Sequence, residues 1–261
     1  MNKANYTPKS SFKRLPDDQK LCRSELLDCD ICFDTGSTAD IIPKPLLEQF
    51  IQKGFVVEDA EGPRTFVPAD GVPITFESCK WLTLPLSLRH WYRSVFQVSD
   101  VAEGRTPCLA IGRRLLKKCV IEYTRDSINL LDDCPEAYSD KVPLEEEGGS
   151  YYVNLLVNGR EHRCYLDTGH SDPISLPERE SVFAISPIHE IEDELVLHGR
   201  VNKVVDLEEE RACLQIGGIT RHGPIVYADY YKHPCWFNPT KIFAEFVIDL
   251  SGGYIAFNIN K

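Results

Sequence analysis

The tripeptide Asp-Thr-Gly occurs twice in this chain, and each copy follows a short apolar run. The first copy is Asp34-Thr35-Gly36, preceded by Ile31-Cys32-Phe33. The second is Asp167-Thr168-Gly169, preceded by Cys164-Tyr165-Leu166, 133 positions further on. One Asp-Thr-Gly at the end of a strand is a common Asx turn. Two copies at matching positions instead indicate a duplicated unit whose Asp leaves the sheet for a shared purpose.

A second set of matching stretches extends the repeat. Val120-Ile121-Glu122 in the first half matches Val247-Ile248-Asp249 in the second half, at an offset of 127. Their apolar flanks match as well: Leu115-Leu116 with Ile242-Phe243, Ile128 with Ile255, and Leu130 with Phe257. The second half is therefore six residues shorter between these landmarks. An internal repeat of this kind predicts two β-rich units of shared architecture.

The composition changes between the two halves. Residues 132–150 carry seven Asp and Glu against Lys141 and end in Gly148-Gly149, which is typical of an acidic, solvated linker. We therefore expect an N-terminal lobe at residues 1–140 and a C-terminal lobe at residues 141–261, each with one Asp-Thr-Gly.

Strand patterns dominate the chain. Alternating or β-rich runs occupy residues 82–88, 95–98, 127–131, 151–157, 161–166, 194–197, 212–216 and 254–259. Asn158-Gly159 lies between two of these runs and predicts a hairpin turn. Helical signals are restricted to residues 43–53, 113–118 and 240–245. The sequence predicts a mostly β fold with few short helices.

Charge and hydropathy exclude several functions. The 261 residues carry a net charge of −11, which repels phosphate backbones and argues against nucleic-acid binding. No apolar stretch approaches the roughly 20 residues that span a bilayer. Residues 1–20 contain no apolar export segment. Either the chain stays inside the cell or its signal was removed, and we expect a cytoplasmic location.

The ten cysteines do not form a clear framework. Cys29 and Cys32 form a Cys-x-x-Cys on a predicted strand, where three steps cover about 10 Å, too far for a disulfide. His233-Pro-Cys235 lacks the spacing and the partner pair of a zinc site. We expect buried thiols that outnumber disulfides, and no metal site.

Other catalytic patterns are missing from the sequence. No spacing selects one of the seven His as partner of a nucleophilic Cys, and no Gly-x-Ser-x-Gly or Gly-rich phosphate loop occurs.

The duplicated Asp-Thr-Gly resembles that of the aspartic protease superfamily, which includes the pepsin-like and retroviral-protease-like enzymes. Leu109-Ala110-Ile111-Gly112 and residues 113–116 resemble the family's hydrophobic-hydrophobic-Gly stretch and short helix. Residues 120–131 and 243–258 resemble the closing hairpin of each lobe. Asn238-Pro239 stands where the family has Gly, which makes the local turn of the second lobe a departure from the pattern.

The resemblance implies a two-lobed aspartic protease fold with a pseudo-twofold axis, active as a monomer and without a cofactor. Asp34 and Asp167 would meet at that axis. Two carboxyls so close share a proton, so that one activates water and the other protonates the carbonyl oxygen of a polypeptide substrate. The expected function is an aspartic endopeptidase. The alternative is a silent protease-like module that binds peptides or acts as a scaffold.

The resemblance also assigns supporting residues. Thr35 and Thr168 would hydrogen-bond to the backbone of the opposite lobe, and Gly36 and Gly169 would let N–H groups approach the carboxylates. The Ser37 hydroxyl would contact the outer oxygen of Asp34.

His170 stands at the position equivalent to Ser37. If it contacts Asp167 while protonated, its charge favours ionised Asp167 and leaves the shared proton on Asp34. The alternative is an ordinary surface or core histidine.

A flap is expected to cover the substrate. Its candidate turns lie at Gly62 or Gly71 in the first lobe and at Gly199 in the second lobe.

Overall fold

The computed structural model describes residues 8–67, 73–101, 106–177, 188–197, 200–227 and 233–258. Strands make up most of these residues, which confirms the mostly β prediction. The helices are α1 (Lys44–Gln52), α2 (Arg113–Leu116) and the short 3-10 helix η2 (Pro239–Lys241). No helix among the described residues has the length and apolarity needed to cross a membrane.

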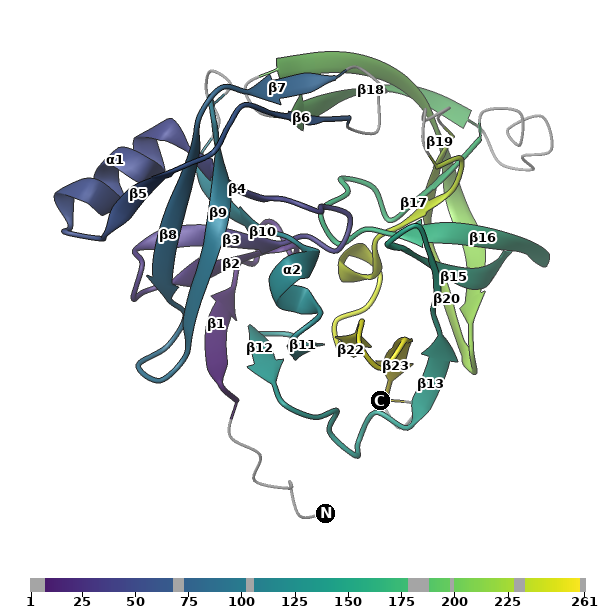
Figure 1. The fold of residues 1–261 in the computed structure, drawn as a ribbon. Coiled ribbons are helices and arrows are strands. Elements are labelled where there is room, and N and C mark those ends of the chain that lie inside the picture. The colour runs from purple at the N-terminus through teal and green to yellow at the C-terminus, as the bar shows by residue number, and fades with distance from the viewer. Residues whose placement is uncertain are drawn as a thin grey trace.

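The strands fall into two related series, one in each half of the chain (Figure 1). The first series is β1 (Ser10–Arg14), β2 (Leu21–Ser24), β3 (Cys29–Phe33), β4 (Asp40–Pro43), β5 (Val57–Ala60), β6 (Arg64–Phe66), β7 (Ile74–Phe76), β8 (Cys79–Pro85), β9 (Trp91–Ser99), β10 (Cys108–Ile111), β11 (Val120–Tyr123) and β12 (Ser127–Leu131). The second is β13 (Asp140–Pro143), β14 (Glu145–Glu147), β15 (Ser150–Val157), β16 (Arg160–Leu166), β17 (Ile174–Leu176), β18 (Ile188–Leu197), β19 (Arg200–Ile216), β20 (Ile219–Tyr227), β21 (Trp236–Phe237), β22 (Phe246–Asp249) and β23 (Tyr254–Phe257).

One sheet joins the two halves. Within the larger sheet the strands run in the order β13-β23-β22-β11-β12-β1, so three strands of one half mirror three of the other. The central antiparallel pair sets Ile121 opposite Ile248 and Tyr123 opposite Phe246. The predicted repeat thus appears as a pseudo-twofold arrangement whose axis passes between β11 and β22.

The predicted acidic linker is wrong in part. Residues 140–143 form β13, which pairs with β23, and residues 145–147 form β14, which pairs with β15. Strand pairing uses backbone groups, so side-chain charge does not prevent it while those side chains face solvent. Lys117 and Arg163 also neutralise glutamates of β14. The expected boundary after residue 140 therefore falls inside β13.

Two of the three predicted helices are confirmed, and the third ends early. α1 begins after Pro43 and buries Leu46, Leu47 and Phe50 on one face. Residues 240–245 were expected to be helical, but the 3-10 helix ends at Lys241. Asn158 and Gly159 adopt positive φ in the predicted hairpin turn between β15 and β16.

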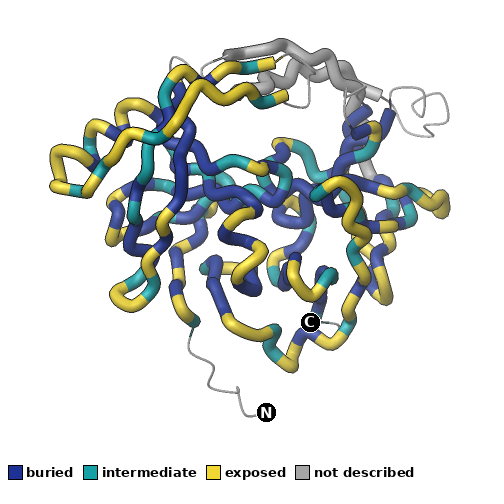
Figure 2. The backbone as a smooth tube through the Cα atoms, viewed as in Figure 1, coloured by how far each residue is buried: buried dark blue, intermediate teal, exposed yellow. Residues whose placement is uncertain are grey.

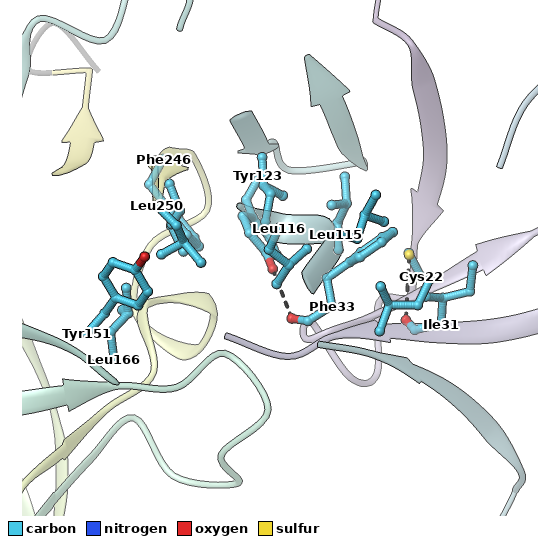
Figure 3. Close-up of a cluster of buried hydrophobic side chains, with 14 of the residues drawn as sticks. Cys22, Ile31, Phe33, Leu115, Leu116, Tyr123, Tyr151, Leu166, Phe246 and Leu250 are labelled. Atoms are coloured by element: carbon cyan, nitrogen blue, oxygen red, sulfur yellow. Dashed lines mark hydrogen bonds between the residues drawn. The ribbon is translucent and has the colours of Figure 1, made fainter. Parts of the chain in front are cut away.

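Buried residues form one large core that continues through both lobes (Figure 2). Figure 3 shows part of it, with Phe33, Leu115 and Tyr123 from the first half. Leu166 and Phe246 of the second half belong to the same core. Phe33 and Leu166 directly precede the two Asp-Thr-Gly copies, so the core anchors the strands that carry them.

Candidate active site

The two Asp-Thr-Gly copies begin where β3 and β16 end. The N–H of Asp34 donates to the Ile111 carbonyl at 2.9 Å, and the N–H of Asp167 donates to the Phe237 carbonyl at 3.0 Å. Each Asp is thereby fixed at the junction of two parallel strands, β3 with β10 and β16 with β21. The match between the two junctions follows from the duplicated sequence.

Thr35 and Thr168 link the two lobes through reciprocal hydrogen bonds. The N–H of each threonine donates to the hydroxyl oxygen of the other at 3.0 Å. The Thr35 hydroxyl then donates to the Leu166 carbonyl at 3.1 Å, and the Thr168 hydroxyl donates to the Phe33 carbonyl at 2.5 Å. Both side chains are fully buried. The predicted contacts with the opposite lobe are present, and they hold the two Asp-bearing loops together.

Gly36 and Gly169 each lie against the carboxyl group of the opposite lobe. A Cβ on Gly169 would stand 2.6 Å from Asp34 Cγ, and a Cβ on Gly36 would overlap the Asp167 carboxyl. Any side chain at either position would therefore push the two carboxyls apart. Glycine is needed here for close approach.

The carboxyl groups of Asp34 and Asp167 lie close together, each against the glycine of the opposite lobe. Burial, followed by the charge of Asp34 and the hydrogen bond to it, raises the pKa of Asp167 well above its ordinary value. Asp167 is 9% exposed, whereas Asp34 is half-buried. Asp167 therefore keeps a proton at pH values at which an ordinary carboxyl has lost it.

Backbone donors differ between the two carboxyls. Asp34 Oδ1 accepts the N–H groups of Gly36 at 2.8 Å and Ser37 at 2.9 Å. Asp167 Oδ1 accepts the N–H of Gly169 at 2.8 Å. Hydrogen bonds to a carboxylate favour its ionised form, and Asp34 accepts two of these bonds where Asp167 accepts one.

Lys20 is a site residue that the sequence did not single out. Its Nζ donates to the Gly169 carbonyl at 3.3 Å, across the lobe boundary. Burial disfavours the charged form, but the neighbouring Cys32 and Asp18 raise the pKa of Lys20 above its usual value. The resulting cation acts on Asp167 and partly opposes the rise in its pKa.

Tyr165 is a second site residue that the sequence analysis missed. Its hydroxyl donates to the Gly36 carbonyl at 2.6 Å. The signal was available, since residues two apart on a strand share a face and Tyr165 precedes Asp167 by two positions. The sequence gives no such signal for Lys20, because the position of Lys20 beside the site depends on how the strands pair.

The Ser37 side chain does not make the expected contact with Asp34. Its hydroxyl donates to the Ala39 carbonyl at 2.8 Å and accepts the Ala39 N–H at 3.1 Å. Ser37 contributes its backbone N–H to Asp34 instead. The hydroxyl is committed to closing the local turn, which a sequence position alone does not reveal.

His170 matches the alternative of a core histidine. The ring is buried, lies 2.7 Å through Nε2 from Ser175 Oγ and stacks on Trp236. Burial, with the nearby Lys20 and Lys241, lowers the pKa of His170 to about 3, although Asp172 lies 3.6 Å away. A neutral His170 cannot favour ionised Asp167, so the condition under which Asp34 would hold the proton is not met.

Asn238-Pro239 compensates for its own departure from the family pattern. In the first lobe the Arg113 N–H donates to the Ser37 carbonyl at 2.9 Å. Pro239 occupies the position of Arg113 and has no N–H. The Asn238 side-chain amide supplies the donor, reaching the His170 carbonyl at 2.6 Å. The turn of the second lobe is therefore closed by a side chain instead of the backbone.

The flap candidates are partly outside the described residues. Gly71 and Gly199 lie there, as does the turn that joins β6 to β7. Gly62 precedes β6 and lies near Cys79, so it is not at a hairpin turn. The paired strands β6 and β7 lie at the end of the molecule opposite β22 and β23 (Figure 1).

No cluster of three His, Cys, Asp or Glu suited to a metal ion occurs among the described residues.

Comparisons with known proteins give remote structural similarity. Neither the protein-family models nor the curated proteins contain a match. Among solved structures, basic 7S globulin from soybean is 10% identical with a TM-score of 0.44, over 95% of this chain and 94% of that chain. Conglutin gamma, a basic 7S globulin from lupine seeds, is 11% identical with a TM-score of 0.44, over 95% and 90% of the two chains. Both are globulins by name, and similarity this remote leaves the function to be argued from the site.

Proposed function

We propose that this protein is an aspartic endopeptidase that cleaves an extended polypeptide bound between its lobes. The observation that carries the proposal is the close approach of the Asp34 and Asp167 carboxyls, held by the reciprocal threonine bonds between the lobes. A carboxyl pair with one proton is the arrangement required for acid and base catalysis on water.

The two carboxyls have different roles in the proposed reaction. Ionised Asp34 takes a proton from a water molecule, which attacks the scissile carbonyl carbon. Protonated Asp167 donates to the carbonyl oxygen, and a tetrahedral diol forms without a covalent bond to the enzyme. The proton on Asp34 then passes to the leaving nitrogen as the carbon–nitrogen bond breaks, and Asp167 recovers its proton as the new carboxyl group forms.

The first prediction tests the dyad. Asp34→Asn and Asp167→Asn should each lower peptide cleavage by roughly 10²–10⁴-fold, because each removes one acid or base. The assay is mass spectrometry of a peptide mixture incubated with the protein between pH 3 and 8, with and without the transition-state analogue pepstatin. Thermal unfolding of each variant shows whether it still folds.

Asp30→Asn is the matched control. It makes the same substitution on the same strand, at a carboxyl paired with Arg23 outside the site, and should leave cleavage unchanged. Retention of most activity by either dyad variant would remove the proposal.

The second candidate is a module that binds polypeptides without cutting them. It is favoured by the side chains of Ser37 and His170. The resemblance expects both at the dyad carboxyls, but they form hydrogen bonds with Ala39 and Ser175. Binding of a fluorescent peptide, without cleavage by the wild-type protein at any pH, would support this candidate instead.

A further inference from the structure

Two cysteines of the second lobe lie opposite each other on neighbouring parallel strands. Cys164 belongs to β16, and Cys235 immediately precedes β21. The register pairs Tyr165 with Trp236, and the Tyr165 N–H donates to the Cys235 carbonyl at 2.8 Å. The two Cα atoms are therefore one strand spacing apart, about 4.8 Å, which lies within the range that a disulfide spans.

The two side chains point to the same side. The Cys235 thiol is close enough to Cys164 to contribute to its raised pKa. No disulfide is present among the described residues, which include all ten cysteines. The pair is thus reduced but already arranged for bridging.

The two thiols differ in access. Cys164 is fully buried, whereas Cys235 is half-buried at the edge of the same hydrophobic core. Burial and the neighbouring Cys235 raise the pKa of Cys164 well above its ordinary value, so Cys164 stays protonated. Cys235 is the sulfur that a reagent from solvent meets first.

We propose that Cys164 and Cys235 form an oxidation site at which a peroxide produces a disulfide. The Cys235 sulfur attacks the peroxide, the oxygen–oxygen bond breaks, and sulfenic acid and water (or an alcohol) form. The Cys164 sulfur then attacks the Cys235 sulfur while its proton passes to the departing hydroxyl group, so that water leaves and the two sulfurs are joined. Together the thiols lose two hydrogens, and the peroxide accepts two electrons.

The bridge would lie beside the dyad. The strands that carry the two cysteines are the strands whose pairing holds Asp167, through its N–H bond to the Phe237 carbonyl. A covalent link three residues before Asp167 would restrict separation of these strands. The amide hydrogens of Tyr165 and Asp167 should consequently exchange several-fold more slowly in the oxidised protein. The inference does not depend on proteolytic activity.

The test uses the full chain, reduced and then treated with hydrogen peroxide. After denaturation, the number of thiols that react with iodoacetamide should fall from ten to eight, and the intact mass before alkylation should fall by about 2 Da. Tryptic digestion without reductant should give residues 164–179 joined to residues 233–241. Dithiothreitol should restore all ten thiols.

Two substitutions test whether disulfide formation is specific to Cys164 and Cys235. Cys235→Ser should reduce bridging of Cys164 at least ten-fold. Cys29→Ser is the matched control, because Cys29 also has a thiol neighbour, Cys22, on the adjacent strand. The Cys29→Ser variant should form the Cys164–Cys235 bridge to the same extent as the wild-type protein. Ten reactive thiols after treatment, sulfinic acid on Cys235 without a bridge, or bridges confined to other cysteines would each overturn the proposal.

Discussion

Asp34 and Asp167 share a motif but differ in surroundings. Asp34 is half-buried and accepts two backbone N–H groups, whereas Asp167 is buried and accepts one from its own loop. A duplicated sequence therefore produces an asymmetric pair. The asymmetry arises from residues outside the motif, and the proposed reaction uses it by giving the two carboxyls different roles.

The second prediction concerns Lys20. Replacing it with Met removes a cation that favours ionised Asp167, so the pKa of Asp167 should rise further. The basic limb of the pH profile of kcat/KM, which reports loss of the Asp167 proton in the free enzyme, should move to higher pH. Lys53→Met, at the end of α1, is the control and should leave the limb in place. An unmoved basic limb in Lys20→Met would show that the ammonium does not act on the dyad.

The third prediction concerns stability and His170. Burial holds the pKa of His170 at about 3 in the folded state, against about 6.5 in the unfolded state. The stabilisation from neutral His170 is complete above pH 6.5 and is lost as pH falls from 6.5 toward 3, because the unfolded state then binds a proton that the folded state excludes. Between pH 6.5 and 4.5 this amounts to about 2–3 kcal/mol.

His170→Gln should remove that part of the pH dependence. Urea unfolding at pH 7.5 and 4.5 measures it, and the wild-type protein should lose about 2–3 kcal/mol more than the variant. His222→Gln changes an exposed histidine and should behave as wild type. Equal losses in His170→Gln and the wild-type protein would mean that the ring reaches solvent in the folded state.

For single residues, the sequence predicted those whose contacts lie within or beside the Asp-Thr-Gly motif. Thr35 and Gly36 are determined by the tripeptide and its duplicate. Lys20 was missed, and the two interpretations of His170 stayed open, because the surroundings of both residues come from segments distant in the sequence. Lys20 contacts Gly169 across the lobe boundary, and His170 is covered by Trp236.

The turns that close each lobe show how two different local sequences produce one geometry. A backbone N–H closes the turn after β10, and the Asn238 side chain closes the corresponding turn after β21. Sequence comparison of the two halves detects the difference at Asn238-Pro239. It does not reveal the compensation, which depends on where the amide points.

The fourth prediction concerns the threonine link between the loops that follow β3 and β16. Thr168→Val keeps the shape of the side chain but leaves the Thr35 N–H without its acceptor, while the Phe33 carbonyl keeps the Tyr123 hydroxyl at 3.4 Å. A buried group without a partner costs about 1–3 kcal/mol, so we expect a loss of about 1–3 kcal/mol. Thr168→Ser keeps the hydroxyl and should lose about 1 kcal/mol for one methyl group.

Chemical unfolding at neutral pH measures both variants. Thr168→Val should also lower peptide cleavage more than Thr168→Ser, because the dyad loses its cross-lobe support. Equal destabilisation by the two substitutions would show that packing, and not the hydroxyl, holds the loops together.

At the scale of the molecule, the two lobes are connected by shared secondary structure and hydrogen bonds. They share the central sheet through the β11–β22 pair. Arg14 of β1 is buried and donates from its guanidinium to the carbonyls of Thr240 and Ala244 in the second half, at 3.1 and 3.0 Å. The repeat in the sequence predicted two related units. It could not predict their shared sheet, because pairing between halves is invisible in either half alone.

The final prediction follows from this shared sheet. We divide the chain between residues 139 and 140 into two fragments. The first fragment keeps Tyr138, whose hydroxyl donates to Glu122 at 3.0 Å, and the second fragment keeps β13. Each fragment alone would expose the apolar faces and an open edge at β11 or β22, so neither should form a folded monomer. When the two fragments are mixed and refolded from denaturant, they should form a 1:1 complex with the same unfolding transition and the same peptide-cleaving activity as the intact chain. The intact chain should itself sediment as a monomer. Cooperative unfolding of either fragment as an isolated monomer would mean that the halves are independent domains.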